Sequence, residues 1–125
     1  MPGIGKLSVF AIDCPDPRAL AGFYSVLTGF PLGADDEDNE WIELAGDQPV
    51  LAFQRVADYI APVWPGSSHP QQAHLDFDVL NLDEGEQKVL ALGARKAEFQ
   101  PGTTFRVFLD PAGHPFCLVL DHSMR

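Results

Sequence analysis

The amino-acid sequence predicts an α+β fold made of two copies of a βαβββ module. Its 125 residues, 46% of them hydrophobic, suffice for one globular domain with a substantial core. The order of strand-like and helix-like patterns in the first half occurs again in the second half. Asp13 and Asp78 close the first strand of each half and lie 65 positions apart. Gly29 and Gly93 follow the two helices and lie 64 positions apart. This offset, near half the chain, indicates an internal duplication.

The first module begins with a strand and a helix. Residues 7–13 alternate around Phe10, which is typical of a strand. Asp16 then supplies an N-cap, and Pro17 occupies the first turn of a helix. Apolar side chains recur at helical spacing through the following turns, at Leu20, Phe23, Tyr24 and Leu27. Gly29 stands where a left-handed cap is expected, so an amphipathic helix that packs on a sheet is predicted.

Three further strand-like segments follow this helix, at residues 30–32, 40–44 and 50–56. The spacing of the last two suits a hairpin. The acidic run at 35–40 is predicted to be a solvated loop. Residues 57–72 are rich in proline and show neither helical nor strand periodicity, so they are predicted to connect the two modules.

The second module repeats this order. Residues 73–79 form a predicted strand, and a helix is predicted from about Asp83 to Leu92, with Gly93 at its end. Asp83, with Glu86 three positions later, approximates a capping box. The remaining strands are predicted at residues 96–99, 105–110 and 116–120.

The composition argues against several classes of partner. The chain carries 18 acidic and 8 basic residues, a formal net charge of −10. Its average field therefore repels phosphate backbones and anionic lipid surfaces. No apolar stretch approaches the ~20 residues of a membrane span. We expect neither a nucleic acid nor a membrane as partner.

The N-terminal segment and the cysteines favour a cytoplasmic location. Residues 1–6 lead directly into a strand-like pattern and lack the regions of a secretory signal. Cys14 and Cys117 lie at or near apolar strands, as reduced, buried thiols do, and a disulfide is the less favoured alternative. The sequence contains no glycine-rich phosphate loop, so no nucleotide cofactor is expected.

Several motifs resemble those of the vicinal oxygen chelate superfamily, which includes glyoxalases, bleomycin-resistance proteins and dioxygenases. The first-helix signature of that family is similar to residues 16–30, and its Asp-Pro-x-Gly-Asn turn is similar to residues 109–116. Residues 74–79 and 92–94 extend the resemblance over nearly the whole chain. The order and spacing of these motifs carry the resemblance, because each motif alone is short.

The resemblance implies how the modules are arranged. Curved mixed sheets from both modules form a cup around a site, within one glyoxalase-like domain over residues 1–125. The modules lie at about 6–56 and 73–121, joined by the proline-rich connector. Many relatives pair modules within or between chains, so a homodimer is expected. Trp64-Pro65 and residues 113–117 resemble more closely a branch of glyoxalase-like proteins common in actinobacteria.

The resemblance also implies metal-ligand positions on strands that line the cup. These positions fall on Val9, Gln54, His74 and Cys117. Val9 has no donor atom, and the set lacks the carboxylates that magnesium, manganese and iron prefer. We therefore expect no tightly held catalytic metal and no other cofactor. Zinc bound by His74 and Cys117 stays open as an alternative.

His74 and Asp76 are the candidate catalytic residues. Alternation places them, with Asp78, on the polar face of their strand, opposite an apolar face that a helix should cover. In the cup, His74 could orient a ligand or exchange a proton near neutral pH, with Asp76 as its neighbour. The alternative is a histidine that makes only local hydrogen bonds.

Beside this pair, four residues are predicted to bind a ligand: Gln54, Tyr59, Trp64 and Cys117. Tyr59 and Trp64 lie on the connector, where no strand pattern explains an aromatic side chain, although they could also cover a sheet edge. Gln54 could equally be a polar residue at a strand end. The apolar neighbours of Cys117 predict a buried, inert thiol and not a nucleophile. Asp110 is predicted to stabilise a turn.

Three functions are consistent with these features. The first is a glyoxalase-like protein that binds a small, partly apolar molecule without a catalytic metal, as a sequestering or resistance protein does. The second is an enzyme: a metal-dependent lyase, isomerase or dioxygenase, or a metal-free catalyst using His74 and Asp76. The third is a structural or regulatory domain. The fold alone does not decide among them.

Overall fold

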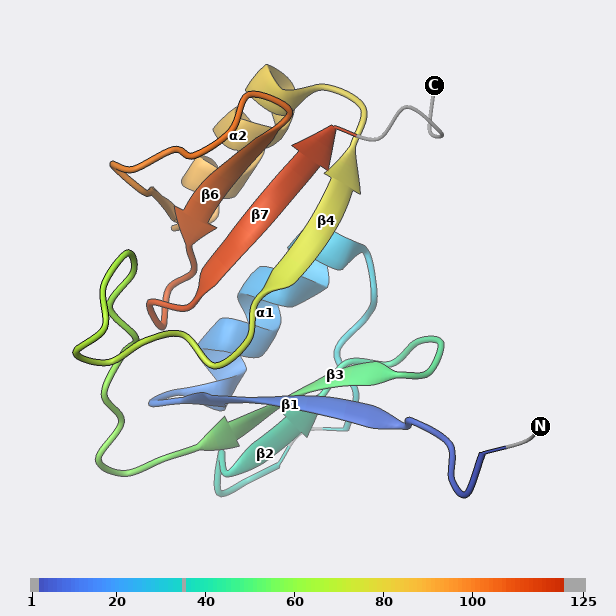
Figure 1. Cartoon of the computed structure of the whole chain (residues 1–125). Coiled ribbons are helices and arrows are strands. Elements are labelled where there is room, and N and C mark those ends of the chain that lie inside the picture. Colours follow the sequence, from blue (N-terminus) through green and yellow to red (C-terminus); the bar gives the residue numbers. More distant parts are fainter. Residues whose placement is uncertain (1–2, 35, 121–125) are drawn as a thin grey trace. The chain divides into compact units, whose positions relative to one another are not determined.

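The computed structural model describes residues 3–34 and 36–120, which fall into two compact units, Met1–Tyr59 and Ile60–Arg125. The division lies inside the predicted connector. Each unit has one α-helix and its own mixed sheet, as Figure 1 shows, and the predicted α+β fold is confirmed. The single domain expected over residues 1–125 stays a prediction. Within the described residues, no helix is long and apolar enough to cross a membrane.

The first unit has a three-stranded sheet with one helix. Its elements are β1 (Val9–Cys14), α1 (Pro17–Thr28), β2 (Trp41–Glu43) and β3 (Val50–Arg55). The strand order is β1-β3-β2, with β1 parallel and β2 antiparallel to β3, so the predicted hairpin is confirmed. The apolar stripe of α1 packs on the sheet, where the ring of Tyr24 stacks on that of Phe53 with centroids 5.6 Å apart.

Local signals determine both ends of α1. The Asp16 carboxylate accepts a hydrogen bond from the Ala19 amide, and Pro17 occupies the first turn. The helix ends at Gly29, which has a φ of 81° and donates its N–H to the Ser25 carbonyl. Because only glycine adopts this left-handed conformation without steric cost, the predicted C-terminal cap is confirmed.

The strand predicted at residues 30–32 is reduced to one bridge between Leu32 and Leu44. Pro31 has no N–H to donate to a ladder. Gly33 donates its N–H to the Glu43 carbonyl at 2.8 Å, and a Cβ at Gly33 would lie 2.6 Å from that oxygen. The chain therefore passes too close to β2 here for a regular strand with alternating side chains.

The second unit contains the complete βαβββ order. Its elements are β4 (Leu75–Val79), α2 (Leu82–Ala91), β5 (Arg95–Lys96), β6 (Phe105–Leu109) and β7 (Pro115–Leu120). The strand order is β4-β7-β6-β5; β4 is parallel to β7, and the other pairs are antiparallel. On the face of this sheet that packs against α2, the Phe116 ring stacks on that of Phe108 with centroids 5.7 Å apart. It meets the Phe77 ring edge-on, with centroids 6.1 Å apart.

The capping box predicted for the second helix is wrong. The N-cap is Asn81, whose side-chain oxygen accepts the Glu84 amide at 2.9 Å. Asp83 and Glu86 instead form ion pairs with Arg106 of β6, at 2.8 and 3.2 Å. The carboxylates therefore face a guanidinium from the neighbouring sheet, a contact that local spacing does not reveal.

Strand β5 is shorter than the predicted strand at 96–99. The Gln100 side chain takes the place of a strand ladder beyond Lys96. Its amide nitrogen donates to the carbonyls of Ala97 and Val107, and its oxygen accepts the Val107 amide at 2.9 Å. These bonds satisfy the backbone groups that a longer β5 would have paired.

Candidate functional site

Within the second unit, one face of the sheet packs against α2, and α2 leaves the other face, called the open face below, uncovered. Strand register places Asp76 opposite Cys117, and Cys117 opposite Val107, so these side chains share the open face. Leu118, on the other face, lies against α2, since a Cβ on Gly85 of that helix would be 3.1 Å from its side chain. The predicted division of this strand into a polar and a core face agrees with the register.

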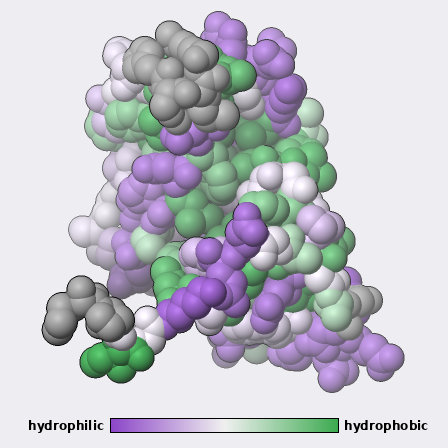
Figure 2. Space-filling model, turned by 90° about the vertical axis from the view of Figure 1, so that its right-hand side faces the viewer, coloured by the Kyte–Doolittle hydropathy of each residue, from purple (hydrophilic) through white to green (hydrophobic). Residues whose placement is uncertain are grey.

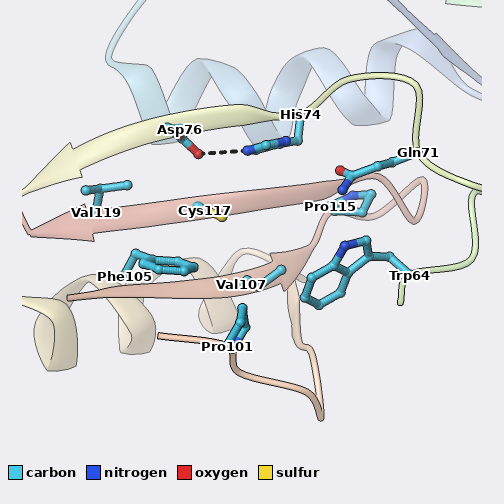
Figure 3. A pocket seen from close by; sticks show the side chains of 10 residues that line it. All are labelled: Trp64, Gln71, His74, Asp76, Pro101, Phe105, Val107, Pro115, Cys117 and Val119. Atoms are coloured by element: carbon cyan, nitrogen blue, oxygen red, sulfur yellow. Dashed lines mark ion pairs between the residues drawn. The ribbon is translucent and has the colours of Figure 1, made fainter. Parts of the chain in front are cut away.

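A pocket of about 400 Å³ lies on this open face, and all of its lining residues belong to the second unit. Figure 3 shows His74 and Asp76 on the β4 side and Trp64 with Gln71 at one end. The apolar part of the floor comes from β6 and β7, through Phe105, Val107, Cys117 and Val119. Cavities of roughly 300–1,000 Å³ with mostly apolar walls are typical of small-molecule sites.

His74 and Asp76 contact each other inside the pocket. The distance from His74 Nε2 to an Asp76 carboxylate oxygen is 3.2 Å, and the side chains are 44% and 56% exposed. An ion pair so exposed contributes only roughly 0–1 kcal/mol, so it does not hold the two groups rigidly. The side chains of His74 and Asp76 can therefore turn toward a ligand. The same contact is also consistent with the alternative that His74 makes only a local hydrogen bond.

Cys117 is buried in the pocket floor and forms no disulfide. Burial raises the pKa of its thiol to about 11, and the nearby Asp76 carboxylate adds to this effect. The thiol therefore keeps its proton at neutral pH. Only a thiolate is a strong nucleophile, so the environment agrees with the predicted inert thiol.

The connector contributes Trp64 and Gln71 to the pocket. It folds back on itself where the Val63 amide donates to the His69 carbonyl at 2.6 Å. The Trp64 ring is half-buried against Phe99, with centroids 5.8 Å apart. The side-chain oxygen of Gln71 is buried and has no hydrogen-bond partner among the described residues. Such an acceptor costs about 1–3 kcal/mol unless another molecule donates to it.

The structure brings together four of the six predicted site residues: Trp64, His74, Asp76 and Cys117. Gln54 and Tyr59 belong to the first unit. Gln54 is exposed on β3, opposite Asp13 and Trp41, and Tyr59 is half-buried. For these two residues, a binding role stays a prediction.

Gln71 and most of the apolar lining were not predicted from the sequence. Alternation along β6 and β7 was the available signal, because Phe105, Val107 and Val119 share the face of Cys117. Gln71 has no such pattern, since it lies in the irregular connector. Its position depends on how the connector folds.

The family model of the glyoxalase-like domain matches residues 9–119. The chain belongs to this family. The match agrees with the resemblance to the vicinal oxygen chelate superfamily. A comparison with proteins of curated function found no match.

Solved structures with the same fold carry related descriptions. A glyoxalase/bleomycin resistance protein/dioxygenase family enzyme from Burkholderia phytofirmans PsJN is 21% identical, with a TM-score of 0.69 over 91% of this chain and 97% of that one. A glyoxalase-related enzyme from Fulvimarina pelagi is 20% identical, with a TM-score of 0.66 and coverage of 94% and 89%. A lactoylglutathione lyase from Agrobacterium tumefaciens is 17% identical, with a TM-score of 0.61 and coverage of 96% of each chain. At these identities the likeness establishes the fold and not an activity.

In the second unit of this glyoxalase-like domain, His74, Asp76 and Cys117 carry donor atoms that could ligate a metal, whereas their counterparts in the first unit lack donors. In the second unit, Asp76 pairs with Cys117 across neighbouring strands. The residues 65 positions earlier, Ala11 and Ala52, form the equivalent pair in the first unit. The counterpart of His74 at that offset is Val9. Gln54, one of the metal-ligand positions that the resemblance implies, lies two residues beyond Ala52. The donor set of the second unit contains only one carboxylate, Asp76. It therefore suits magnesium, manganese and iron poorly, because these ions prefer several oxygen ligands.

Proposed function

We propose that this glyoxalase-like protein binds a small, partly apolar molecule in the pocket of its second unit. The make-up of that pocket carries the proposal: a largely apolar floor with a few polar groups along one side and one end. Asp76 offers a carboxylate, and Gln71 adds an amide side chain whose buried oxygen has no hydrogen-bond partner among the described residues. None of the described residues that line the pocket is a lysine or an arginine. The favoured ligand is therefore an apolar body that carries a hydrogen-bond donor.

Binding in this proposal requires no magnesium, manganese or iron. Asp76 is the one carboxylate among the described residues that line the pocket, and the first-unit counterparts supply no donor. Ligand binding should therefore survive dialysis against a chelator. A role in sequestering a toxic or antibiotic molecule would need nothing beyond such binding.

Thermal-shift screening of small apolar amines and amides, followed by calorimetric titration of a hit, tests the proposal. Trp64→Ala and His74→Ala should each weaken binding tenfold to a hundredfold, about 1–3 kcal/mol, because a stacked ring or a desolvated hydrogen bond is lost. Trp41→Ala and His69→Ala are matched controls, since neither side chain lines the pocket. Equal affinity in all four variants would rule out this pocket as the site.

A metal-free acid–base enzyme is the second candidate. The 3.2 Å contact between His74 and Asp76 inside the pocket favours it, because a carboxylate beside an imidazole is a common proton-transfer pair. Incubating a bound hit with the protein and analysing it by mass spectrometry separates the two functions. An enzyme converts the compound and loses this conversion in Asp76→Asn while the compound still binds.

We also propose that the protein is a homodimer that works in the cytoplasm. Each sheet, taken by itself, has two edge strands: β1 and β2 in the first unit, β4 and β5 in the second. Large apolar side chains such as Phe10 and Phe99 are exposed, and exposed apolar surface favours association. Figure 2 shows apolar residues among hydrophilic ones on one face of the molecule. Neither Cys14 nor Cys117 forms a disulfide, which suits a reducing compartment.

A further inference from the structure

The connector places an amide with an unpaired oxygen at one end of the pocket. The Gln71 side chain lines the pocket, and Figure 3 shows its amide extending from the connector toward Pro115. The amide oxygen is buried and has no hydrogen-bond partner among the described residues. Buried acceptors in folded proteins are nearly always paired, because an unpaired one destabilises the fold. This oxygen therefore points to a ligand that supplies the missing donor.

A flat apolar surface lies beside this amide. Trp64 lines the same end of the pocket (Figure 3), and its ring packs on Phe99 with centroids 5.8 Å apart. The ring also packs against the buried cluster that contains Val107 and Cys117. Aromatic rings held in this way favour flat partners that stack on them or meet them edge-on. A cavity of about 150 Å³ holds benzene, so a pocket of about 400 Å³ has room for two fused rings.

The charges around the pocket disfavour an anionic ligand. Asp76 lines the pocket, and none of the described lining residues is a lysine or an arginine. The chain as a whole has a formal net charge of −10. A carboxylate or a phosphate on the ligand would therefore be repelled and would find no permanently cationic partner. A neutral polar group avoids both costs.

The amide of a glutamine is complementary to one kind of neutral group. It offers an acceptor oxygen and N–H donors side by side. A planar group with an N–H beside a carbonyl pairs with both in two parallel hydrogen bonds. A half-turn of the amide exchanges its oxygen and its nitrogen, and a flat ligand that turns over pairs with that arrangement as well. Esters and lactones lack the N–H, so they leave the buried oxygen unpaired.

Resting on the proposed small-molecule binding, we propose that Gln71 and Trp64 form a subsite for a neutral, planar group with an N–H beside a carbonyl, as in a lactam or a primary carboxamide. The indole stacks on the flat body of the ligand, and the amide pairs with its polar edge. His74 and Asp76, on the β4 side of the pocket, stay available to the rest of the molecule.

A pair of compounds that differ by one N–H tests this subsite. Quinolin-2-one is a flat lactam, and coumarin is the lactone of the same shape, with a ring oxygen in place of the N–H. Calorimetric titration of the full-length protein should show that quinolin-2-one binds at least about tenfold more tightly, because only the lactam satisfies the Gln71 oxygen. In Gln71→Leu the two affinities should become equal to within about a factor of three, because the amide is gone.

Gln72→Leu is the matched control, since Gln72 is exposed and does not line the pocket. It should keep the preference for the lactam. A second readout needs no ligand. Gln71→Leu removes an unpaired buried acceptor, so it should raise the melting temperature of the free protein, whereas Gln72→Leu should leave it unchanged. A lower melting temperature in Gln71→Leu would mean that the oxygen already has a partner, and would count against the subsite.

The outcomes separate this inference from the proposed function on which it rests. Equal affinities for the two compounds in the unmodified protein, or a preference that persists in Gln71→Leu, would overturn the lactam subsite. If both compounds bind equally well and Trp64→Ala weakens both, the small-molecule site stands and only the assigned ligand class fails. If neither compound binds, the ligand class fails, and the thermal-shift screen decides whether the pocket binds another molecule.

Discussion

At the scale of single residues, Cys117 shows how surroundings decide chemistry. The thiol lies beside Asp76 on the pocket floor, yet burial raises its pKa to about 11 from an ordinary 9.0. In the metal-free Cys14→Ala variant, Cys117 should therefore react with iodoacetamide far more slowly at pH 8 than a free cysteine does. The rate should rise as the pH approaches 11, because the thiolate is the reactive form. Alkylation at pH 8 as fast as in the urea-unfolded protein would contradict the assigned environment.

Asp110 is the second residue whose role can be measured directly. Its side chain is 2% exposed, and one carboxylate oxygen accepts the amides of Ala112 and His114 at 2.8 and 3.0 Å. Asp110→Ala removes the carboxylate that accepts both amides and should lower the free energy of unfolding by about 2–4 kcal/mol in urea titration. Asp47→Ala, in an exposed loop, is the control and should change it by less than about 0.5 kcal/mol. Similar effects of both substitutions would mean that the turn does not depend on this carboxylate.

At the scale of elements, the start of α2 depends on Asn81. Asn81→Ala should reduce the free energy of unfolding by about 1 kcal/mol, because the Glu84 amide loses its acceptor. Asn81→Ser keeps a capping oxygen and should restore most of that loss. Denaturant titration of the three proteins measures both effects. Equal stability of the alanine and serine variants would show that the cap is not formed.

The two helices also show what sequence patterns can and cannot predict. Both ends of α1 were predictable, because Asp16, Pro17 and Gly29 act on backbone within one turn of themselves. The start of α2 was predicted within one residue, but its N-cap was not: Asn81 was overlooked although its bond to the Glu84 amide is local. Asp83 and Glu86 were assigned to a capping box because their actual partner, Arg106, lies about twenty positions later.

The same distinction applies to the candidate site. Alternation along one strand was enough to place Asp76 on an open face, and its meeting with Cys117 agrees with the expected pairing of first and last strands. Placing Trp64 and Gln71 at the end of the pocket required the fold of the connector, for which no periodicity exists. Identifying Ala52 as the first-unit counterpart of Cys117 required the observed strand register.

At the scale of the whole molecule, the proposed homodimer predicts a mass twice that of one chain. A single chain has a mass of 13.7 kDa. Size-exclusion chromatography with light scattering should therefore return about twice this mass at micromolar concentrations, since edge strands and exposed apolar side chains favour association. A mass of one chain across a wide concentration range would contradict the dimer.

The central claim is that the pocket of the second unit is where this glyoxalase-like protein binds a small molecule. Backbone-amide NMR spectra, recorded while a thermal-shift hit is titrated into the uniformly ¹⁵N-labelled protein, test it most directly. The claim predicts saturable shifts that centre on Gln71, Asp76, Val107 and Cys117, the residues that surround the pocket. Saturable shifts confined to residues 9–55, with those four amides unmoved, would contradict it.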